Sequence, residues 1–393
     1  ASSKHAAHNG TSSCLRLRGQ PLASVATSAS DPYPAPVQSR IALAATLAAV
    51  GALLALGPGW LVDPREPPPL AGGIHVNEPD LDLYATALTT AGLDSVQVTA
   101  YARQPVWDGA DLVWPDRDPE EVRYQIRKAH DGKLAASLVL RLHLEHGVAA
   151  NRHLWHGMVW PKDLDAWFDS YADYALWGAK LAQEEGVELL VLANEMNSMT
   201  STVVPVDGEL SPYEYFADRE RTARVRADLV ACAASVADAE LSWTDGAGFA
   251  TFDDVLRDEE DARRRWSLDV TGGGDREAMR AVLTERAAHL ERRWRLLIED
   301  VRRVYKGPVS LGANFDSFEQ VGFWDAVDAI GVTSYFPLRR WKDDDPEALR
   351  EGWRDVAAKL QAAAAMDDGT TRPVYLLELG YTRKAGCTVR PWS

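Results

Sequence analysis

The chain is poor in cysteine. Its 393 residues include three cysteines, Cys14, Cys232 and Cys387, with no CxxC pair and no spacing typical of zinc ligands. At most one internal disulfide can form, so neither a disulfide framework nor a cysteine-based zinc site is indicated. Cysteine usage therefore gives no indication of the redox compartment.

Positive charge is also scarce. The chain has 42 Lys and Arg against 58 Asp and Glu, a formal net charge of -16. An acidic surface argues against a nucleic-acid partner. No GxGxxG or GxxxxGK motif follows any apolar run, which disfavours a nucleotide-binding open sheet.

Acidic residues are absent from the first thirty positions, and residues 1–40 are predicted to be a disordered leader. Residues 41–62 carry no charge, and about 20 apolar residues span a bilayer. The flanking cations lie mostly before this stretch, which predicts that the main body lies outside the cytoplasm. We expect a transmembrane anchor at 41–62. A cleaved signal peptide, giving a secreted protein, and an organelle transit sequence are the alternatives.

Proline separates the apolar stretch from the C-terminal part of the chain. Residues 63–71 include Pro64, Pro67, Pro68 and Pro69, and are predicted to be a linker. A buried core helix at 41–62 is disfavoured for the same reason.

After the linker, short apolar runs alternate with long helical patterns. Helices are predicted from 118, over 164–186, over 276–307 and after 345. Near-continuous apolar strands separated by helices are typical of a parallel sheet. Strands are predicted at 72–76, 94–101, 134–144, 187–193, 308–314, 328–335 and 373–378.

Seven such strand–helix units predict a TIM (β/α)8-type barrel over residues 72–393 rather than an open doubly wound sheet. The stretch at about 200–275 is longer than a usual connection and is predicted to be an insertion over the carboxyl ends of the strands. An eighth strand–helix unit is not apparent in the sequence, and its absence would leave two strand edges open.

Two predicted strands end in a carboxylate. Glu195 follows "VELLVLAN", and Glu378 ends "PVYLLE". Functional side chains of TIM barrels lie where strands end, so both should face the same mouth. Two opposed carboxylates can flank a glycosidic bond, one protonating the leaving oxygen and the other attacking the anomeric carbon.

With these residues in order, the chain resembles the clan A glycoside hydrolases, and most closely the family 113 β-mannanase-like proteins. The resemblance covers about residues 72–393 and is carried by "LRLHLEHG", "LWHGMVWP", "VLANEM", "AIGVTSYFPL" and "LELGYTRKAGCTVRPW". It implies a retaining enzyme that acts on a β-linked polysaccharide or oligosaccharide, with β-mannan as the family's suggestion.

The resemblance also implies roles for individual residues. Glu195 would be the general acid/base and Glu378 the nucleophile. Asn194 would hydrogen-bond the sugar hydroxyl next to the anomeric carbon, and Tyr335 would steady the nucleophile. The sugar-binding cleft would be lined by Arg141, His143 and Trp155.

Simpler roles are open for several of these residues. Glu195 could be a salt-bridged residue, Arg141 could balance buried acids, and Tyr335 could cap the barrel rim. His143 and His146 form HxxH, but strand alternation should point the two rings to opposite faces, so a metal pair is not expected.

The prediction is a glycoside hydrolase with a carbohydrate substrate and neither metal nor cofactor. A non-catalytic carbohydrate-binding or cell-surface protein on a decayed hydrolase barrel is the second hypothesis. A transglycosylase, which would use the same two carboxylates, is the third. The sequence predicts no oligomeric state.

Overall fold

A computed structural model gives the structure of the chain. The described residues are 65–74, 80–114, 119–204, 212–233, 251–338, 345–381, 388 and 391. The predicted leader at 1–40 and the predicted hydrophobic helix at 41–62 lie outside them, so the structure gives that helix no support. Within the described ranges, no helix combines the length and the apolar character needed to cross a bilayer.

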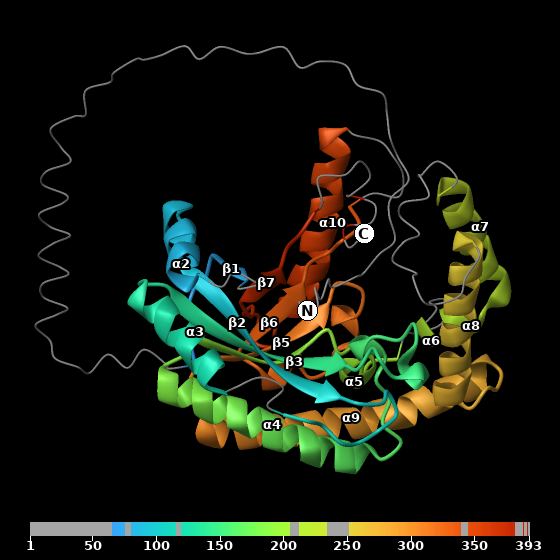
Figure 1. Ribbon diagram of the computed structural model, residues 1–393, viewed down its shortest axis with the longest axis horizontal. Coiled ribbons are helices and arrows are strands. Elements are labelled where there is room, and N and C mark those ends of the chain that lie inside the picture. Colours follow the sequence, from blue (N-terminus) through green and yellow to red (C-terminus); the bar gives the residue numbers. More distant parts are fainter. Residues whose placement is uncertain are drawn as a thin grey trace, which may run out of the picture. The chain divides into compact units, whose positions relative to one another are not determined.

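Seven strands form a single parallel sheet in the order β1-β2-β3-β4-β5-β6-β7 (Figure 1). Sequential parallel order with helices in the crossovers is the arrangement of a TIM-like barrel, as the sequence predicts. The strands are β1 (Gly72–Ile74), β2 (Ser95–Gln104), β3 (Ala135–Leu144), β4 (Leu189–Asn194), β5 (Val309–Asn314), β6 (Ala329–Thr333) and β7 (Val374–Glu378).

The crossover helices begin and end at residues with a clear physical reason. α4 is capped by Asp163, whose side chain accepts a hydrogen bond from the Ala166 N–H, and it stops at Gly186 in the left-handed region. Trp167, Tyr171 and Tyr174 of α4 are fully buried against the sheet. The helices are α2 (Leu81–Thr90), α3 (Pro119–Asp131), α4 (Leu164–Glu185), α9 (Arg276–Val304) and α10 (Pro346–Ala364).

The prediction that a helix follows each strand is wrong for the connection between β5 and β6, all of which the structure describes. Between β5 and β6 the chain forms only two short 3₁₀ turns, Phe318–Gln320 and Trp324–Ala326. Phe318, Phe323 and Trp324 are buried there. Three large aromatic side chains thus cover the sheet where a helix would otherwise do so.

The segment before β1 packs against the last strand. Residues 65–71 form neither helix nor strand. The Asp94 N–H donates a hydrogen bond to the carbonyl of Ala71. The hydroxyl of Tyr375 in β7 donates a hydrogen bond to the carbonyl of Pro68. Leu70, Tyr375 and Leu377 also pack against buried Val139 and Val191 of β3 and β4. These contacts place the segment before β1 against β7 and against apolar side chains of β3 and β4.

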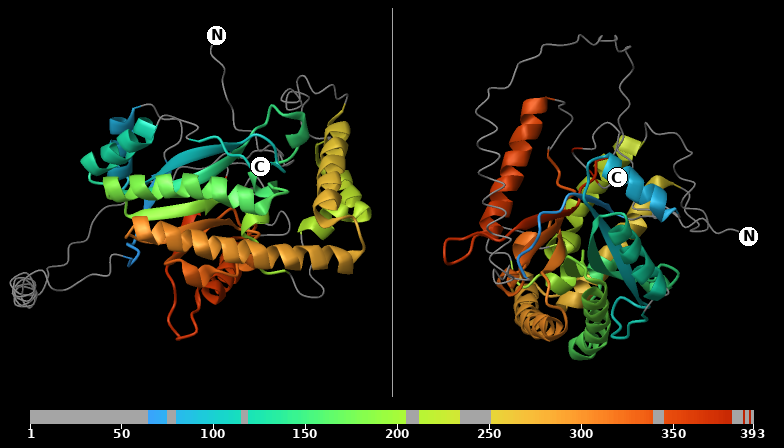
Figure 2. Two further views of the ribbon diagram at one scale, coloured as in Figure 1. Left: turned by 90° about the horizontal axis from the view of Figure 1, so that it is seen from below. Right: turned by 90° about the vertical axis from the view of Figure 1, so that its left-hand side faces the viewer.

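The predicted insertion contains α6 (Pro212–Ala217), α7 (Arg219–Ala233) and α8 (Phe252–Thr271), and α5 (Asn197–Thr200) precedes it. Residues 205–211 and 234–250 of this stretch lie outside the described residues. α7 and α8 lie together beyond the N-terminal end of α9, whereas the rest of α9 runs beside α4 along the sheet (Figures 1 and 2). The insertion is therefore joined to the barrel through the long helix α9.

Candidate active site

Glu195 stands one residue beyond β4, with a backbone in the left-handed region at φ 53°. Its N–H donates to the carbonyl of Gly312 at 2.7 Å, which continues the pairing of β4 with β5. A left-handed conformation costs a non-glycine residue about 1 kcal/mol or more. Here it turns the side chain out of the strand, where its carboxylate lies 3.0 Å from Arg141 Nη2 and 3.4 Å from His156 Nε2.

Glu378 is the last residue of β7, and its carboxylate is nearly fully buried. Asn194 Nδ2 donates to Oε1 at 3.2 Å, and the Tyr335 hydroxyl donates to Oε2 at 3.0 Å. Arg141 Nη1 lies 3.5 Å from Oε1. Each oxygen thus has a polar partner, and the orientation of the carboxylate is fixed.

Arg141 of β3 joins the two carboxylates, because one terminal nitrogen contacts Glu195 and the other contacts Glu378. Two oxygens held in this way by one guanidinium lie at most about 9 Å apart, a bound that admits both retaining pairs, at about 5–5.5 Å, and inverting pairs, at about 6.5–9.5 Å. Burial would lower the pKa of Arg141, but the charges of Glu378 and Glu195 raise it above its usual value.

The pKa of Glu195 differs from the expectation for a general acid. Burial would raise it, but the polar contact with His156, the electrostatic effect of His156 and Arg141, and a polar contact with Thr333 lower it to about 2. The raised pKa expected of the acid is therefore not found in the free protein. Arg141 and the polar contacts around the carboxylate favour the ionised form of Glu195.

Tyr335 lies just after β6 and is half-buried. Burial, the charge of Glu378 and the hydrogen bond to Glu378 raise its pKa, so it remains a hydrogen-bond donor. Asn194 is fully buried beside Glu378, and its Oδ1 has no hydrogen-bond partner among the described residues.

Of the other two residues predicted to line the cleft, His143 lies in a strand and Trp155 lies in a loop. His143 shares a face of β3 with Arg141 and is half-buried. Trp155 lies in the loop after β3, where its ring meets that of His156 edge to face at 4.9 Å. Trp155 therefore contacts His156, which in turn contacts Glu195.

The prediction that His143 and His146 point to opposite faces is wrong. Their ring centroids are 5.1 Å apart, in an edge-to-face contact. β3 ends at Leu144, so strand alternation does not extend to His146. Among the described residues, no group of three or more His, Cys, Asp or Glu side chains is arranged to hold a metal ion.

Three residues at the site were not predicted from the sequence: His156, Thr333 and Asp316. His156 lies within the "LWHGMVWP" motif, but nothing local marks it as a neighbour of Glu195. Asp316 follows β5 and accepts a hydrogen bond from Asn197 Nδ2 at 3.0 Å. Desolvation by neighbouring groups and the charge of Glu195 raise the pKa of Asp316 despite that hydrogen bond, although its side chain is exposed to solvent.

Comparison with known families bears on this site. Residues 281–393 match Glycoside Hydrolase Family 113. The match confirms the resemblance to family 113 over the part of the chain that carries Tyr335 and Glu378, and it indicates a glycoside hydrolase. Glu195 and Arg141 lie outside the matched residues. No curated protein matches the chain.

Several solved structures are similar to the chain. A family 113 β-1,4-mannanase in a complex is 16% identical, with 81% of this chain and 74% of that chain covered, at a TM-score of 0.47. The family 113 β-mannanase from Alicyclobacillus acidocaldarius is 18% identical, with 82% and 74% covered and a TM-score of 0.45. A family 5 endoglucanase from Bacteroides salanitronis is 14% identical, with 82% and 77% covered and a TM-score of 0.40. At these TM-scores, the likenesses add no argument about substrate or mechanism.

Proposed function

We propose that the chain is a retaining glycoside hydrolase that acts on a β-linked polysaccharide, with β-mannan as the first substrate to test. The observation that carries the proposal is the pair of carboxylates, Glu195 and Glu378, within reach of one guanidinium at the ends of β4 and β7. The match of residues 281–393 to family 113, together with the resemblance to its β-mannanase-like proteins, suggests the sugar.

In this mechanism Glu378 attacks the anomeric carbon. An attacking carboxylate must be ionised and correctly oriented. Asn194 and Tyr335 donate to its two oxygens, and Arg141 adds a positive charge close to one of them. These partners fix the orientation of the carboxylate and leave it few alternative rotamers.

Glu195 protonates the leaving oxygen as the first bond breaks and then removes a proton from the attacking water. Since His156 and Arg141 keep it ionised in the free protein, it must take up a proton before the first step. The proposed enzyme therefore depends on acidic conditions, or on a substrate that shields Glu195 from these cations.

The test uses the full 393-residue chain with aryl β-glycosides and with β-mannan, β-glucan and xylan. We expect hydrolysis by the unmodified protein. Glu378→Ala should reduce turnover to near background. Glu195→Ala should cost about 10²–10⁴-fold on polysaccharide and less on aryl glycosides, whose leaving groups need little protonation. Proton NMR of the first product should show the β-anomer.

Rescue by azide distinguishes the nucleophile from the acid/base. It should restore turnover of Glu378→Ala as an α-glycosyl azide and of Glu195→Ala as a β-glycosyl azide. An α-anomer from the unmodified protein would mean an inverting enzyme.

A second candidate, non-catalytic glycan binding, is favoured by one observation. Both carboxylates are ion-paired with Arg141, as in a purely structural cluster. Glycan binding that is equal in the unmodified protein and in Glu195→Gln, without turnover by either, would support this candidate. Sugar transfer to added acceptors would instead identify a transglycosylase.

We further propose, from the sequence of residues 41–62, that the protein is anchored in a membrane or secreted, with the barrel outside the cytoplasm. Alkaline extraction of membranes from cells that express the full chain tests this.

A further inference from the structure

The residue that contacts Glu195 from outside the strands is His156, and it belongs to a loop that follows β3. We call residues 148–161 the His156 loop. It contains two 3₁₀ turns, Ala149–Asn151 and His156–Met158. His156 Nε2 lies 3.4 Å from Glu195 Oε2, is buried, and makes no well-aligned hydrogen bond with the described residues. The ring is held instead by its edge-to-face contact with Trp155.

The insertion holds this loop by polar contacts. Asp258 of α8 binds His153 Nε2 at 2.7 Å and Arg152 Nη2 at 2.9 Å. Trp266, also in α8, donates from its indole N–H to the carbonyl of Met158 at 2.9 Å. Asp258 and Trp266 therefore bind loop residues that come before and after His156 in the sequence.

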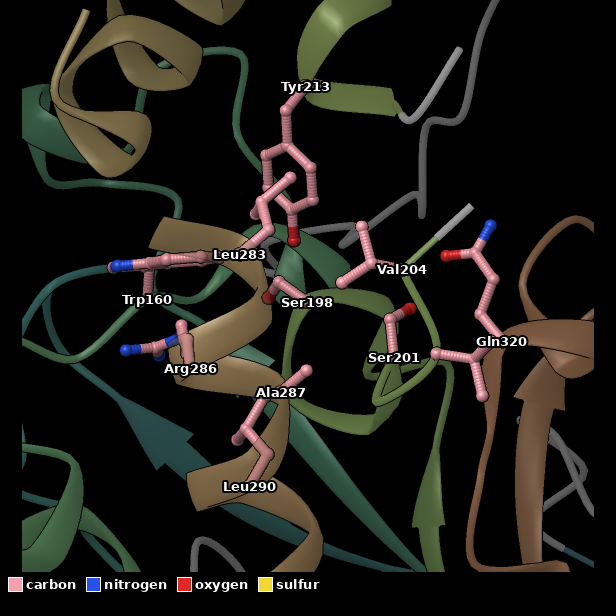
Figure 3. A pocket seen from close by; sticks show the side chains of 11 residues that line it. Trp160, Ser198, Ser201, Val204, Tyr213, Leu283, Arg286, Ala287, Leu290 and Gln320 are labelled. Carbon is pink, nitrogen blue, oxygen red and sulfur yellow. The ribbon is translucent and has the colours of Figure 1, made fainter. Parts of the chain in front are cut away.

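The insertion also holds the loop by packing. The ring of Tyr213 in α6 meets that of Trp160 at 5.5 Å and stacks on that of Trp266 at 5.2 Å. Figure 3 shows Tyr213 above Ser198 of α5, with Trp160 lying over Arg286 of α9. Tyr213, Trp160, Ser198 and Arg286 line a hollow of about 340 Å³, including its open mouth, between the insertion, the loop, α5 and α9.

The loop needs such support because part of its backbone is strained. His153 has φ 63°, a left-handed conformation that costs a non-glycine residue about 1 kcal/mol or more. Its side chain is bonded to Asp258, so the insertion holds the strained residue in place. His156 lies three residues further along the chain, and a relaxed His153 would displace it.

We propose that the insertion is a positioning element for the acid/base: Asp258 of α8 holds His153 and thereby keeps His156 against Glu195. This inference rests on the proposed function. Asp258 touches neither carboxylate, so it is a positioning residue and not a catalytic one.

The electrostatic consequence depends on every group that faces Glu195. Arg141 from β3, His156 from the loop and Thr333 from β6 favour its ionised form. Asp316 after β5, Tyr335 after β6 and Glu378 at the end of β7 are its acidic neighbours. Moving His156 away removes one of the contacts that favour the ionised form, so the pKa of Glu195 should rise toward its ordinary value.

The test compares kcat/KM against pH for an aryl glycoside in the full chain, in His156→Gln, in Asp258→Ala and in the double variant. An opposite charge in contact shifts a carboxyl pKa by about one unit or more. We expect the basic limb to move up by about one pH unit in His156→Gln and by part of that in Asp258→Ala. The double variant should move no further than His156→Gln alone.

Arg226→Gln is the matched control. Arg226 of α7 bonds Asp253 and Glu260 of α8 at 2.7 and 2.8 Å, so its loss removes an ion pair of the insertion that does not involve the His156 loop. It should lower the melting temperature without moving the basic limb. Asp258→Asn serves as a milder second variant. A basic limb that is unmoved in both Asp258 variants, or a double variant whose shift is the sum of the single shifts, overturns the proposal.

A readout without turnover separates this inference from the proposed function. NMR titration of ¹³C-labelled glutamate carboxyls should give a higher pKa for Glu195 in Asp258→Ala than in the unmodified protein, with or without activity. An unmodified protein that shows this coupling but hydrolyses nothing would contradict the proposed function alone. An active enzyme without the coupling would contradict the positioning role alone.

Discussion

The hydroxyl of Tyr335 donates 3.0 Å to Glu378, and this contact makes a specific prediction at the scale of single residues. Tyr335→Phe keeps the ring and removes the donor. A hydrogen bond to a charged group contributes about 1.5–3 kcal/mol, so kcat/KM should fall roughly 10–100-fold with little change in melting temperature. Tyr381→Phe is the control, because its hydroxyl donates to the carbonyl of Phe336 instead. Equal losses in both variants would mean that the effect is structural.

The pH dependence of activity follows from Glu195. Its pKa is lowered to about 2 in the free protein, so its protonated fraction falls as the pH rises above that value. The first chemical step needs the proton, and we therefore expect kcat/KM to be highest at acidic pH and to decline toward pH 7. A profile measured with an aryl glycoside between pH 3 and 8 checks this. An optimum of kcat/KM near neutrality would contradict the lowered pKa, because kcat/KM reports the ionisation of the free enzyme.

The sequence predicted which strands would carry the two carboxylates, and the structure brings Asn194, Arg141 and Tyr335 to them. These residues lie on or just beyond predicted strands, where chain position determines spatial position. His156 could not be found in this way. It reaches Glu195 from a loop whose path depends on packing against α8, far along the chain. The roles of the predicted residues stay predictions.

At the scale of elements, the strands were predicted to within about three residues at each end, because continuous apolar runs mark strands that are buried on both faces. α4, α9 and α10 were predicted from their capping residues and periodicity. The absence of a helix between β5 and β6 was not predicted. Buried Phe318, Phe323 and Trp324 give a short connection enough apolar surface to cover the sheet, and periodicity does not reveal this.

The contact between α3 and α4 depends on Glu185. Arg127 donates two hydrogen bonds to it, at 2.7 and 2.8 Å, and Arg123 adds another. The hydrogen bond from Arg127 is the main cause that lowers its pKa. The carboxylate thus stabilises the fold above its ordinary pKa, and this contribution is lost as the pH falls through the lowered value.

Glu185→Gln should therefore lower the free energy of unfolding by about 1 kcal/mol at pH 7 and by less near pH 3. Chemical denaturation at both pH values measures this. Glu184→Gln is the control, since Glu184 is more exposed and receives a single hydrogen bond from Arg123. A loss of stability that does not change with pH would exclude the ionic explanation.

At the scale of the whole molecule, two glycines let the barrel interior close. Gly312 of β5 and Gly331 of β6 are paired in register, and Leu377 of β7 packs over both. A Cβ on Gly331 would lie 2.3 Å from the carbonyl oxygen of Leu311 and 2.6 Å from Leu377. The strands would have to separate to admit it.

Gly331→Ala should destabilise the fold by about 1–3 kcal/mol, as overpacking does. It should also reduce activity, because Gly312, its partner in β5, accepts the backbone hydrogen bond of Glu195. Thermal denaturation and turnover of an aryl glycoside measure the two effects. Gly147→Ala is the control, since a Cβ there meets no atom within 4 Å. A Gly331→Ala protein as stable as the control would mean that the interior adapts.

The left-handed backbone at Glu195 has a consequence for how this molecule can change. Glycine adopts that conformation without a steric penalty, so Glu195→Gly should relieve strain while it removes the carboxylate. Directed evolution for heat resistance alone would thus favour a substitution that abolishes turnover. Thermal stability and catalysis thus favour different residues at position 195, and only selection for both would retain the glutamate.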